Sequence, residues 1–239
     1  MDSIHSLACP NCGYPMPANA TGGTLIKCEA CGTTFNVPTS LTPEPDMGNL
    51  LLAADFRNPL IPGWKVENWD QPTEFGEYEG QPEYRVTLPP QPEHRMDHLI
   101  ATPGILDDFD ACVSLRFLAG DTENYYAALD LRASDEGYYQ VGLDSGGRFQ
   151  VSWFDNVKWC GNLVKWCDQP ALRHGFEVRN TLRVLMRGPQ MRIYLNGVFS
   201  VSLHDARFSA GQLRLVAGPY NQEMRLAISN LQVREARAV

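Results

Sequence analysis

Apolar and polar residues alternate along most of the second half of this chain. In Cys112–Leu118, Val113 and Leu115 point to one side of an extended strand while Ser114 and Arg116 point to the other. Such alternation is typical of β-strands with one buried face. It predicts strands at Cys112–Leu118, Tyr125–Arg132, Tyr138–Asp144, Arg148–Phe154, Thr181–Arg187, Met191–Leu195, Val198–Leu203, Gln212–Val216 and Arg225–Val233.

Turn residues separate these segments, and no amphipathic helix is evident. Asn196-Gly197 is the strongest turn signal, because both residues tolerate the positive φ angles of a two-residue type I′ turn. It predicts a hairpin between Met191–Leu195 and Val198–Leu203. Since each strand has one apolar side, two antiparallel sheets stacked through those sides satisfy the pattern. The expected fold of this part is an antiparallel β-sandwich.

Two tryptophans stand in a short repeat, Val157-Lys-Trp159-Cys160 and Val164-Lys-Trp166-Cys167. Gly161-Asn162 could turn the chain between the copies, which predicts an aromatic-rich hairpin. An exposed pair of indoles would be a stacking platform for sugar rings or a peptide. The alternative is that Trp159 and Trp166 cover the edge of the core, which is the usual fate of this residue.

Tyrosines and arginines form a second candidate surface. Tyr126 and Tyr138 each follow or precede another tyrosine, so each strand presents one tyrosine to each face. If the exposed rings share a face with Arg116, Asp130, Arg132 and Gln140, aromatic and planar hydrogen-bonding groups meet as they do in carbohydrate and peptide sites. A solvated outer sheet face predicts much the same residues, so both interpretations stay open.

A proline-rich segment divides the chain. Residues 39–49 hold Pro43 and Pro45 and no periodic apolar pattern, which predicts a linker. We therefore expect a small domain at 1–38 and the sandwich at 50–239.

The small domain carries two matched cysteine pairs, Cys9-Pro-Asn-Cys12-Gly and Cys28-Glu-Ala-Cys31-Gly. Two-residue spacing lets both thiolates of a pair reach one ion, and two pairs complete a tetrahedral Zn²⁺ site without an open position, which is a structural site. Disulfides or a redox pair are the alternatives. The segment resembles the short prokaryotic zinc-ribbon family, and candidate strands at Thr24–Lys27 and Thr33–Val37 flank the second pair.

The larger part resembles the concanavalin A-like lectin and glucanase jelly roll, in the branch with laminin-G-like and 3-keto-disaccharide hydrolase-like modules. The motifs that carry this resemblance are Asp55-Phe56, Gly63-Trp64, Gly76–Gly80, Tyr84–Leu88, Gly137–Tyr139, Leu163–Trp166, Asn180–Val184, Tyr194–Gly197 and Ile228–Val233. Glucanase relatives carry Glu-x-Asp-x-x-Glu on one strand. The only Glu-x-Asp here is Glu44-Pro-Asp46, which lies in the linker and has Asn49 in place of the second glutamate.

Charge and hydropathy narrow the range of partners and compartments that the sequence predicts. The net charge is −8, and the one segment with a basic excess, 111–239, reaches only +3 with both signs interleaved, so nucleic acid is not an expected partner. No apolar run is long enough to span a membrane and no secretory signal is visible. Because thiolate ligands persist best in a reducing compartment, we expect a cytoplasmic protein.

We interpret the chain as a non-catalytic binding module for a carbohydrate or protein ligand. The alternatives are a glycoside-active enzyme and a structural adaptor with protein partners on both domains.

Overall fold

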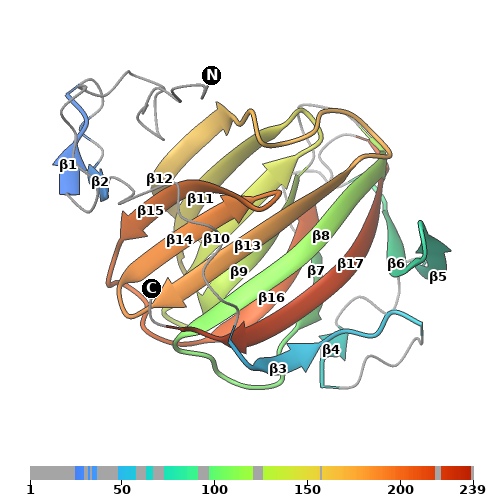
Figure 1. Cartoon of the computed structure of the whole chain (residues 1–239), viewed down its shortest axis with the longest axis horizontal. Helices are drawn as coiled ribbons and strands as arrows, with labels where there is room; N and C mark the ends of the chain where they lie inside the picture. Colours follow the sequence, from blue (N-terminus) through green and yellow to red (C-terminus); the bar gives the residue numbers. More distant parts are fainter. Residues whose placement is uncertain are drawn as a thin grey trace, which may run out of the picture.

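The structure is a computed structural model, and it describes residues 25–29, 32, 34–36, 48–57, 63–66, 73–90, 97–120, 126–156, 158–218 and 222–237. These residues form strands, turns and loops (Figure 1). Within these ranges no helix is long and apolar enough to cross a membrane. The strands are β1 Leu25–Lys27, β2 Thr34–Asn36, β3 Leu50–Ala53, β4 Lys65–Val66, β5 Thr73–Tyr78, β6 Gln81–Leu88, β7 Asp97–Ala101, β8 Phe109–Ala119, β9 Tyr126–Ala133, β10 Gly137–Asp144, β11 Arg148–Asp155, β12 Lys158–Asp168, β13 Arg179–Arg187, β14 Gln190–Leu195, β15 Val198–His204, β16 Gln212–Gly218 and β17 Met224–Glu235.

Two antiparallel sheets make up the sandwich. One has seven strands in the order β12-β11-β10-β9-β16-β7-β4. The other has eight, in the order β15-β14-β13-β8-β17-β6-β5, with β3 paired to β17. Figure 1 shows the eight-stranded sheet in front of the seven-stranded one. A separate pair, β1 and β2, is antiparallel with Lys27 opposite Thr34, and β2 lies beside β15.

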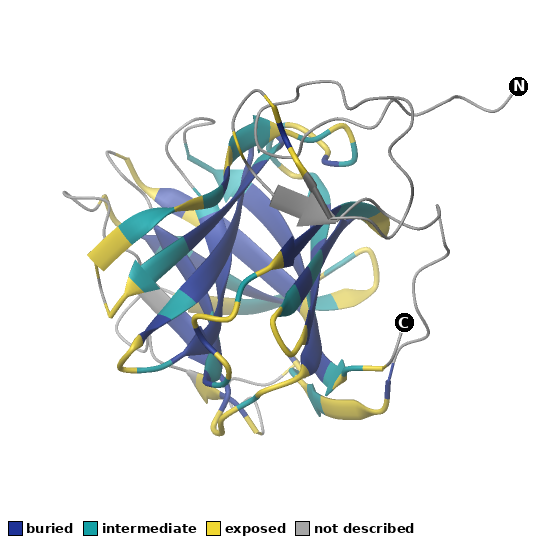
Figure 2. Ribbon diagram, turned by 90° about the vertical axis from the view of Figure 1, so that its left-hand side faces the viewer, coloured by how far each residue is buried: buried dark blue, intermediate teal, exposed yellow. Residues whose placement is uncertain are grey.

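The core lies between the two sheets, where alternate residues of each strand meet. In β8, Val113, Leu115 and Phe117 are buried against residues of the other sheet such as Leu129 and Val141. Figure 2 shows the buried residues gathered in the strands of both sheets. Because each strand contributes one side to the core, its other side is left for the outer face of the sheet.

The structure confirms the predicted sandwich and all nine predicted strands, with ends that differ by a few residues. It also confirms the hairpin of β14 and β15, where Asn196 has φ 50° and Gly197 has φ 78°. The chain before residue 105 adds β3 to β7, which alternation did not mark clearly. The last two residues of the expected linker pair with the sandwich, since Glu235 N–H donates to Asn49 O at 2.9 Å.

The predicted hairpin around Gly161-Asn162 is wrong. Residues 158–168 form one strand, β12, at the edge of the seven-stranded sheet. Its pairing with β11 shifts register between Val151 and Ser152 and again between Trp153 and Phe154. These irregularities break strict alternation, and they hide the strand from a search for period-two patterns. Cys160 and Cys167 therefore lie on the same strand.

Candidate functional site

A row of polar side chains crosses the outer face of the seven-stranded sheet. Arg214 of β16 is opposite Asp130 of β9, which is opposite Gln140 of β10. Gln140 is opposite Ser152 of β11, and Ser152 is opposite Asn162 of β12. We call these five residues the polar ladder. It spans four inter-strand spacings, about 19 Å, perpendicular to the strands.

Two hydrogen bonds hold the ladder together. Gln140 Nε2 donates to Asp130 Oδ1 at 2.8 Å, and Ser152 Oγ donates to Asn162 Oδ1 at 2.8 Å. The three central residues, Asp130, Gln140 and Ser152, are buried, whereas Arg214 is half-buried and Asn162 is exposed. The ladder therefore has a deep polar centre and two accessible ends.

A first aromatic group borders the ladder on one side. Tyr138 of β10 is opposite Phe154 of β11, and Phe154 is opposite Trp159 of β12. The Tyr138 and Phe154 rings stack with centroids 4.7 Å apart and planes 8° apart. The Trp159 side chain is among the most exposed apolar groups, at 56%. This group presents ring faces and an open indole beside polar groups.

A second aromatic group borders the ladder on the other side. The Tyr126 and Trp166 rings meet edge to face at 5.7 Å over Gly142, whose missing side chain leaves them room. A Cβ on Gly142 would lie 3.1 Å from Tyr126 Cδ2. Arg148 lies 5.7 Å from the Trp166 ring and donates from Nε to Asp144 Oδ2 at 2.7 Å. Trp166 is thus held by packing on one side and by a cation on the other.

The ionisable groups at and beside the centre of the polar ladder have raised pKa values. Burial raises the pKa of Asp130 to about 7, and the hydrogen bond from Gln140 and the charge of Arg214 only partly oppose this. Burial likewise raises the pKa of Tyr126 to about 12 and raises that of Tyr138, with the Asp130 charge adding to both effects. Gln140 Oε1 is buried and accepts no hydrogen bond from the part of the chain that the structure describes. Asp130 is therefore a carboxyl group that changes charge near neutral pH.

The structure brings the four predicted aromatic site residues to one face, together with the predicted Asp130 and Gln140. Tyr126, Tyr138, Trp159 and Trp166 all border the ladder, and Trp159 and Trp166 share the edge strand β12. Arg214 and Asn162, the two ends of the ladder, were not predicted from the sequence. Their signal was alternation, because each occupies a position on the solvent side of its strand, but many surface residues carry the same signal.

Arg132 does not belong to this face. Its side chain is buried, and its φ angle is 53°. The pairing of β9 with β16 shifts register at this position, and the guanidinium points away from the outer face of the sheet. It donates to three backbone carbonyls, of Asp107 at 2.9 Å, Gly188 at 2.8 Å and Phe208 at 2.9 Å. The expectation of an exposed Arg132 is therefore wrong. The buried Arg132 side chain connects loops at the end of the sandwich through these hydrogen bonds.

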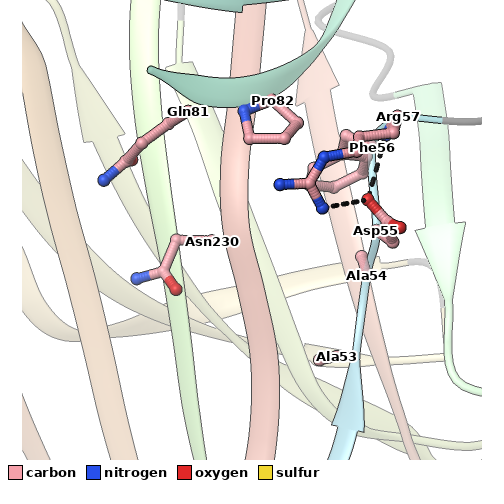
Figure 3. Close-up of a pocket in the computed structure, with 8 residues that line it drawn as sticks. All are labelled: Ala53, Ala54, Asp55, Phe56, Arg57, Gln81, Pro82 and Asn230. Atoms are coloured by element: carbon pink, nitrogen blue, oxygen red, sulfur yellow. Dashed lines mark hydrogen bonds and ion pairs between the residues drawn. The ribbon is translucent and has the colours of Figure 1, made fainter. Parts of the chain in front are cut away.

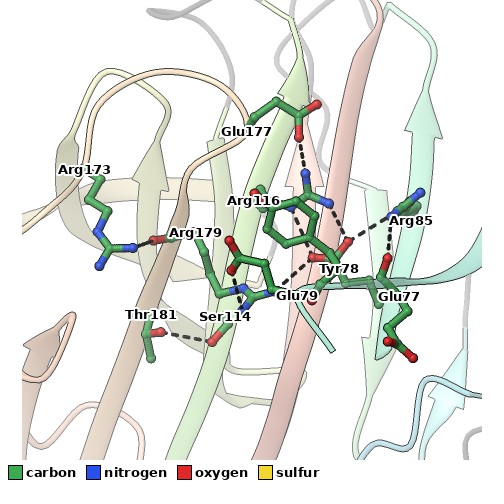
Figure 4. A network of polar contacts seen from close by, with 11 residues as sticks. Glu77, Tyr78, Glu79, Arg85, Ser114, Arg116, Arg173, Glu177, Arg179 and Thr181 are labelled. Atoms are coloured by element: carbon green, nitrogen blue, oxygen red, sulfur yellow. Dashed lines mark hydrogen bonds and ion pairs between the residues drawn. The ribbon is translucent and has the colours of Figure 1, made fainter. Parts of the chain in front are cut away.

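Arg116 lies on the outer face of the eight-stranded sheet, so it cannot share a surface with the tyrosines. Figure 4 shows it beneath the Tyr78 ring, with its Cζ 3.7 Å from the ring centroid. Its guanidinium binds Glu83 at 2.6 Å and also pairs with Glu177. Arg179 Nη2 adds a contact with Glu83 at 3.4 Å. Burial opposes the ionisation of Glu83, but these arginines outweigh it and hold its pKa below the ordinary value.

A hollow of about 390 Å³ lies at one end of the eight-stranded sheet (Figure 3). Its charged groups, Asp55 and Arg57, pair with each other at 3.4 Å, and its one aromatic ring, Phe56, is buried. It therefore offers little beyond two amides to a ligand. Its lining residues are Ala53, Ala54, Asp55, Phe56, Arg57, Gln81, Pro82 and Asn230.

Of the four expected zinc ligands, only Cys28 is among the described residues; Cys9, Cys12 and Cys31 lie outside them. Cys28 is buried, and Gly32 N–H donates to Cys28 O at 2.8 Å with Gly32 at φ 74°. The strands β1 and β2 flank this turn, as the sequence predicted. The described residues contain no group of three or more side chains that could hold a metal ion.

Comparison with known proteins places the fold. No protein-family model and no curated protein sequence matches the chain. Among solved structures, the carbohydrate-binding module CBM66 from Bacillus subtilis is 16% identical with a TM-score of 0.51, over 72% of this chain and 96% of that one. A protein of unknown function with a galectin-like fold, also from Bacillus subtilis, is 7% identical with a TM-score of 0.57, over 81% and 99%.

A third similar structure is the GlcNAcα1-4Gal-releasing endo-β-galactosidase from Clostridium perfringens, 8% identical with a TM-score of 0.57, over 81% of this chain and 64% of that one. At these identities the likeness concerns the fold. The large domain is a galectin-like and concanavalin-like β-sandwich, which is the class that the sequence resemblance implied.

Proposed function

We propose that this chain is a carbohydrate-binding protein whose ligand lies along the polar ladder. The observation that carries the proposal is the arrangement of one face: hydrogen-bonding side chains in a row, with an aromatic group on each side. Sugar rings have hydroxyl groups at their edges and apolar C–H faces. The accessible ends of the ladder, the Arg214 guanidinium and the Asn162 amide, suit the edges, and aromatic rings suit the faces.

The structural likeness adds support of a general kind. One similar structure is named as a carbohydrate-binding module and another as an endo-β-galactosidase, so the sandwich is a scaffold that other chains use for glycans.

A glycoside-active enzyme is the second candidate, and Asp130 is the observation in its favour, since a carboxyl group with a pKa near 7 is suited to general acid catalysis. Glycoside hydrolysis needs a second carboxylate about 5 Å away, or about 6.5–9.5 Å in inverting enzymes. Asp144 lies on the same face, four residues along β10 from Gln140, the residue opposite Asp130. Four residues of a strand span about 13 Å, so the two carboxyl groups stand on positions about that far apart. This separation favours binding over catalysis.

A glycan array with the full chain tests the proposal, followed by titration of the best ligand. We expect Trp166→Ala and Trp159→Ala each to weaken binding about tenfold or more, because each removes a stacking surface. Phe199→Ala is the matched control, since Phe199 packs on Tyr194 in the other sheet. Thermal unfolding measured in parallel separates binding from stability, because loss of a core indole costs about 3–5 kcal/mol.

Equal weakening by the control, or a large loss of stability with unchanged affinity at both tryptophans, would show that the indoles only cover core. Hydrolysis of a bound glycan would establish the second candidate instead.

We also propose that Cys9, Cys12, Cys28 and Cys31 bind one structural Zn²⁺. Support comes from the spacing of the cysteines, the burial of Cys28 and the short strands on each side of its turn. The ion would hold together a segment too small to have a core of its own.

A further inference from the structure

Arg214, at the β16 end of the polar ladder, is half-buried, as are Arg192 and Arg234, and it differs from the arginines of the sandwich that pair with a carboxylate. Arg116, Arg132, Arg148 and Arg183 each pair with a carboxylate. Among the described residues no carboxylate lies within 4.0 Å of Arg214, and its only hydrogen bonds run from Nε and Nη2 to Gln212 Oε1, at 3.4 and 3.2 Å. A guanidinium can make two parallel bonds to a carboxylate, and here that capacity is unused.

Asp130 is the nearest candidate to neutralise Arg214, since the two are opposite each other in register. The Asp130 carboxyl group instead accepts from Gln140, and it makes no ion pair with Arg214. Burial raises its pKa to about 7, so at neutral pH much of the population is uncharged. The polar ladder thus ends in a cation whose neighbour only partly balances it.

We infer that the ligand is an acidic glycan, in which the carboxylate of a uronic acid residue pairs with Arg214. This rests on the proposed function. The aromatic groups stack on sugar rings while Arg214 binds the acid group at one end, and the exposed Asn162 meets neutral hydroxyls at the other. A carboxylate matches the planar fork of the guanidinium and supplies the charge that the protein does not.

The geometry adds a pH dependence. The charged and titratable groups that act on Asp130 are Arg214 on β16, Tyr138 on β10 and Tyr126 on its own strand. Both tyrosines stay neutral below pH 8, and a uronate, like other carboxyl groups, stays ionised above about pH 4. As the pH rises through 7, Asp130 gains charge beside Arg214 and competes with the ligand. Binding of an acidic glycan should therefore strengthen from pH 8 to pH 6.

The test uses the full chain and paired probes: alginate, polygalacturonate and hyaluronan oligosaccharides, each beside its carboxyl-reduced form. We expect at least one acidic form to bind about tenfold or more tightly than its reduced partner. Arg214→Gln should abolish this preference and keep the binding of the reduced form. Arg225→Gln, which removes an exposed arginine from β17 in the other sheet, should keep the preference. Asp130→Asn should remove the change between pH 6 and pH 8.

The outcomes separate the two proposals. If glycans bind without a preference for the acidic form, or Arg214→Gln leaves the preference intact, the inference is wrong and the proposed function stands. If no acidic or neutral glycan binds at all, on this panel or on the wider array, both are wrong.

Discussion

Glu83 offers the sharpest test of how the sandwich is held together. The carboxylate is buried, and it accepts from Arg116 at 2.6 and 3.2 Å and from Arg85 at 3.3 Å, with Arg179 at 3.4 Å. Glu83→Gln keeps the shape of the side chain but removes its charge. The Arg116 side chain, only 4% exposed, would then remain buried with Glu177 as its one carboxylate partner.

The expected cost follows from that burial. Removing one partner of a buried ion pair typically costs about 3–5 kcal/mol, because the other charge stays buried. For a domain of this size each kcal/mol lowers Tm by about 2–4 °C, so a Tm lower by about 10 °C is expected. Glu77→Gln is the matched control: Glu77 is exposed in the same hairpin, and we expect a change within about 0.5 kcal/mol.

Urea unfolding at several pH values measures the effect. The pKa of Glu83 is lowered in the folded state, so its contribution is complete above its ordinary value of 4.5 and is lost as the pH falls through the lower folded value. The difference between wild type and Glu83→Gln should therefore be full at pH 7 and shrink in acid. In the double variant with Arg116→Met the two costs should not add. A cost below 1 kcal/mol, or simple additivity, would refute the argument.

Two further predictions concern stability and metal content. We expect one zinc ion per chain by metal analysis. The ion should be lost in Cys28→Ser and kept in Cys112→Ser, because the Cys112 thiol lies in the sandwich. Protein that contains no metal when prepared without chelator, or a Cys9–Cys12 disulfide in anaerobic protein, would contradict this. Asn196→Ala should cost about 3 kcal/mol in urea unfolding, because Asn196 donates to Ala171 O and Asn180 Oδ1 and accepts from Thr181 N–H, all within 2.8 Å. Asn156→Ala, at a similar φ of 54°, should cost about 1 kcal/mol, and equal costs would assign the effect to the backbone alone.

The sequence allowed the sandwich to be predicted because its central strands alternate strictly around a core, as β8 does. Alternation also predicted that Tyr138 and Tyr139 face opposite sides of their strand, and Tyr139 is the one in the core. It could not place β12, because a bulge changes which side the next residue faces. It could not exclude Arg132, whose turn away from the face depends on a positive φ angle and on carbonyls more than 20 residues away. Arg214 needed the register of three strands before its lack of a carboxylate partner could be seen.

Two of the three central ladder residues stand between two core residues of their own strand. Asp130 lies between Leu129 and Leu131, and Gln140 lies between Tyr139 and Val141, all of them fully buried. The central ladder residues are thus held in place by the same core side chains that stabilise the domain. Binding of a ligand to this face would therefore cost little additional conformational entropy. At the proposed binding face, recognition would draw on rigidity that folding has already supplied, and exchanging an outward residue would alter selectivity without changing the inward ones.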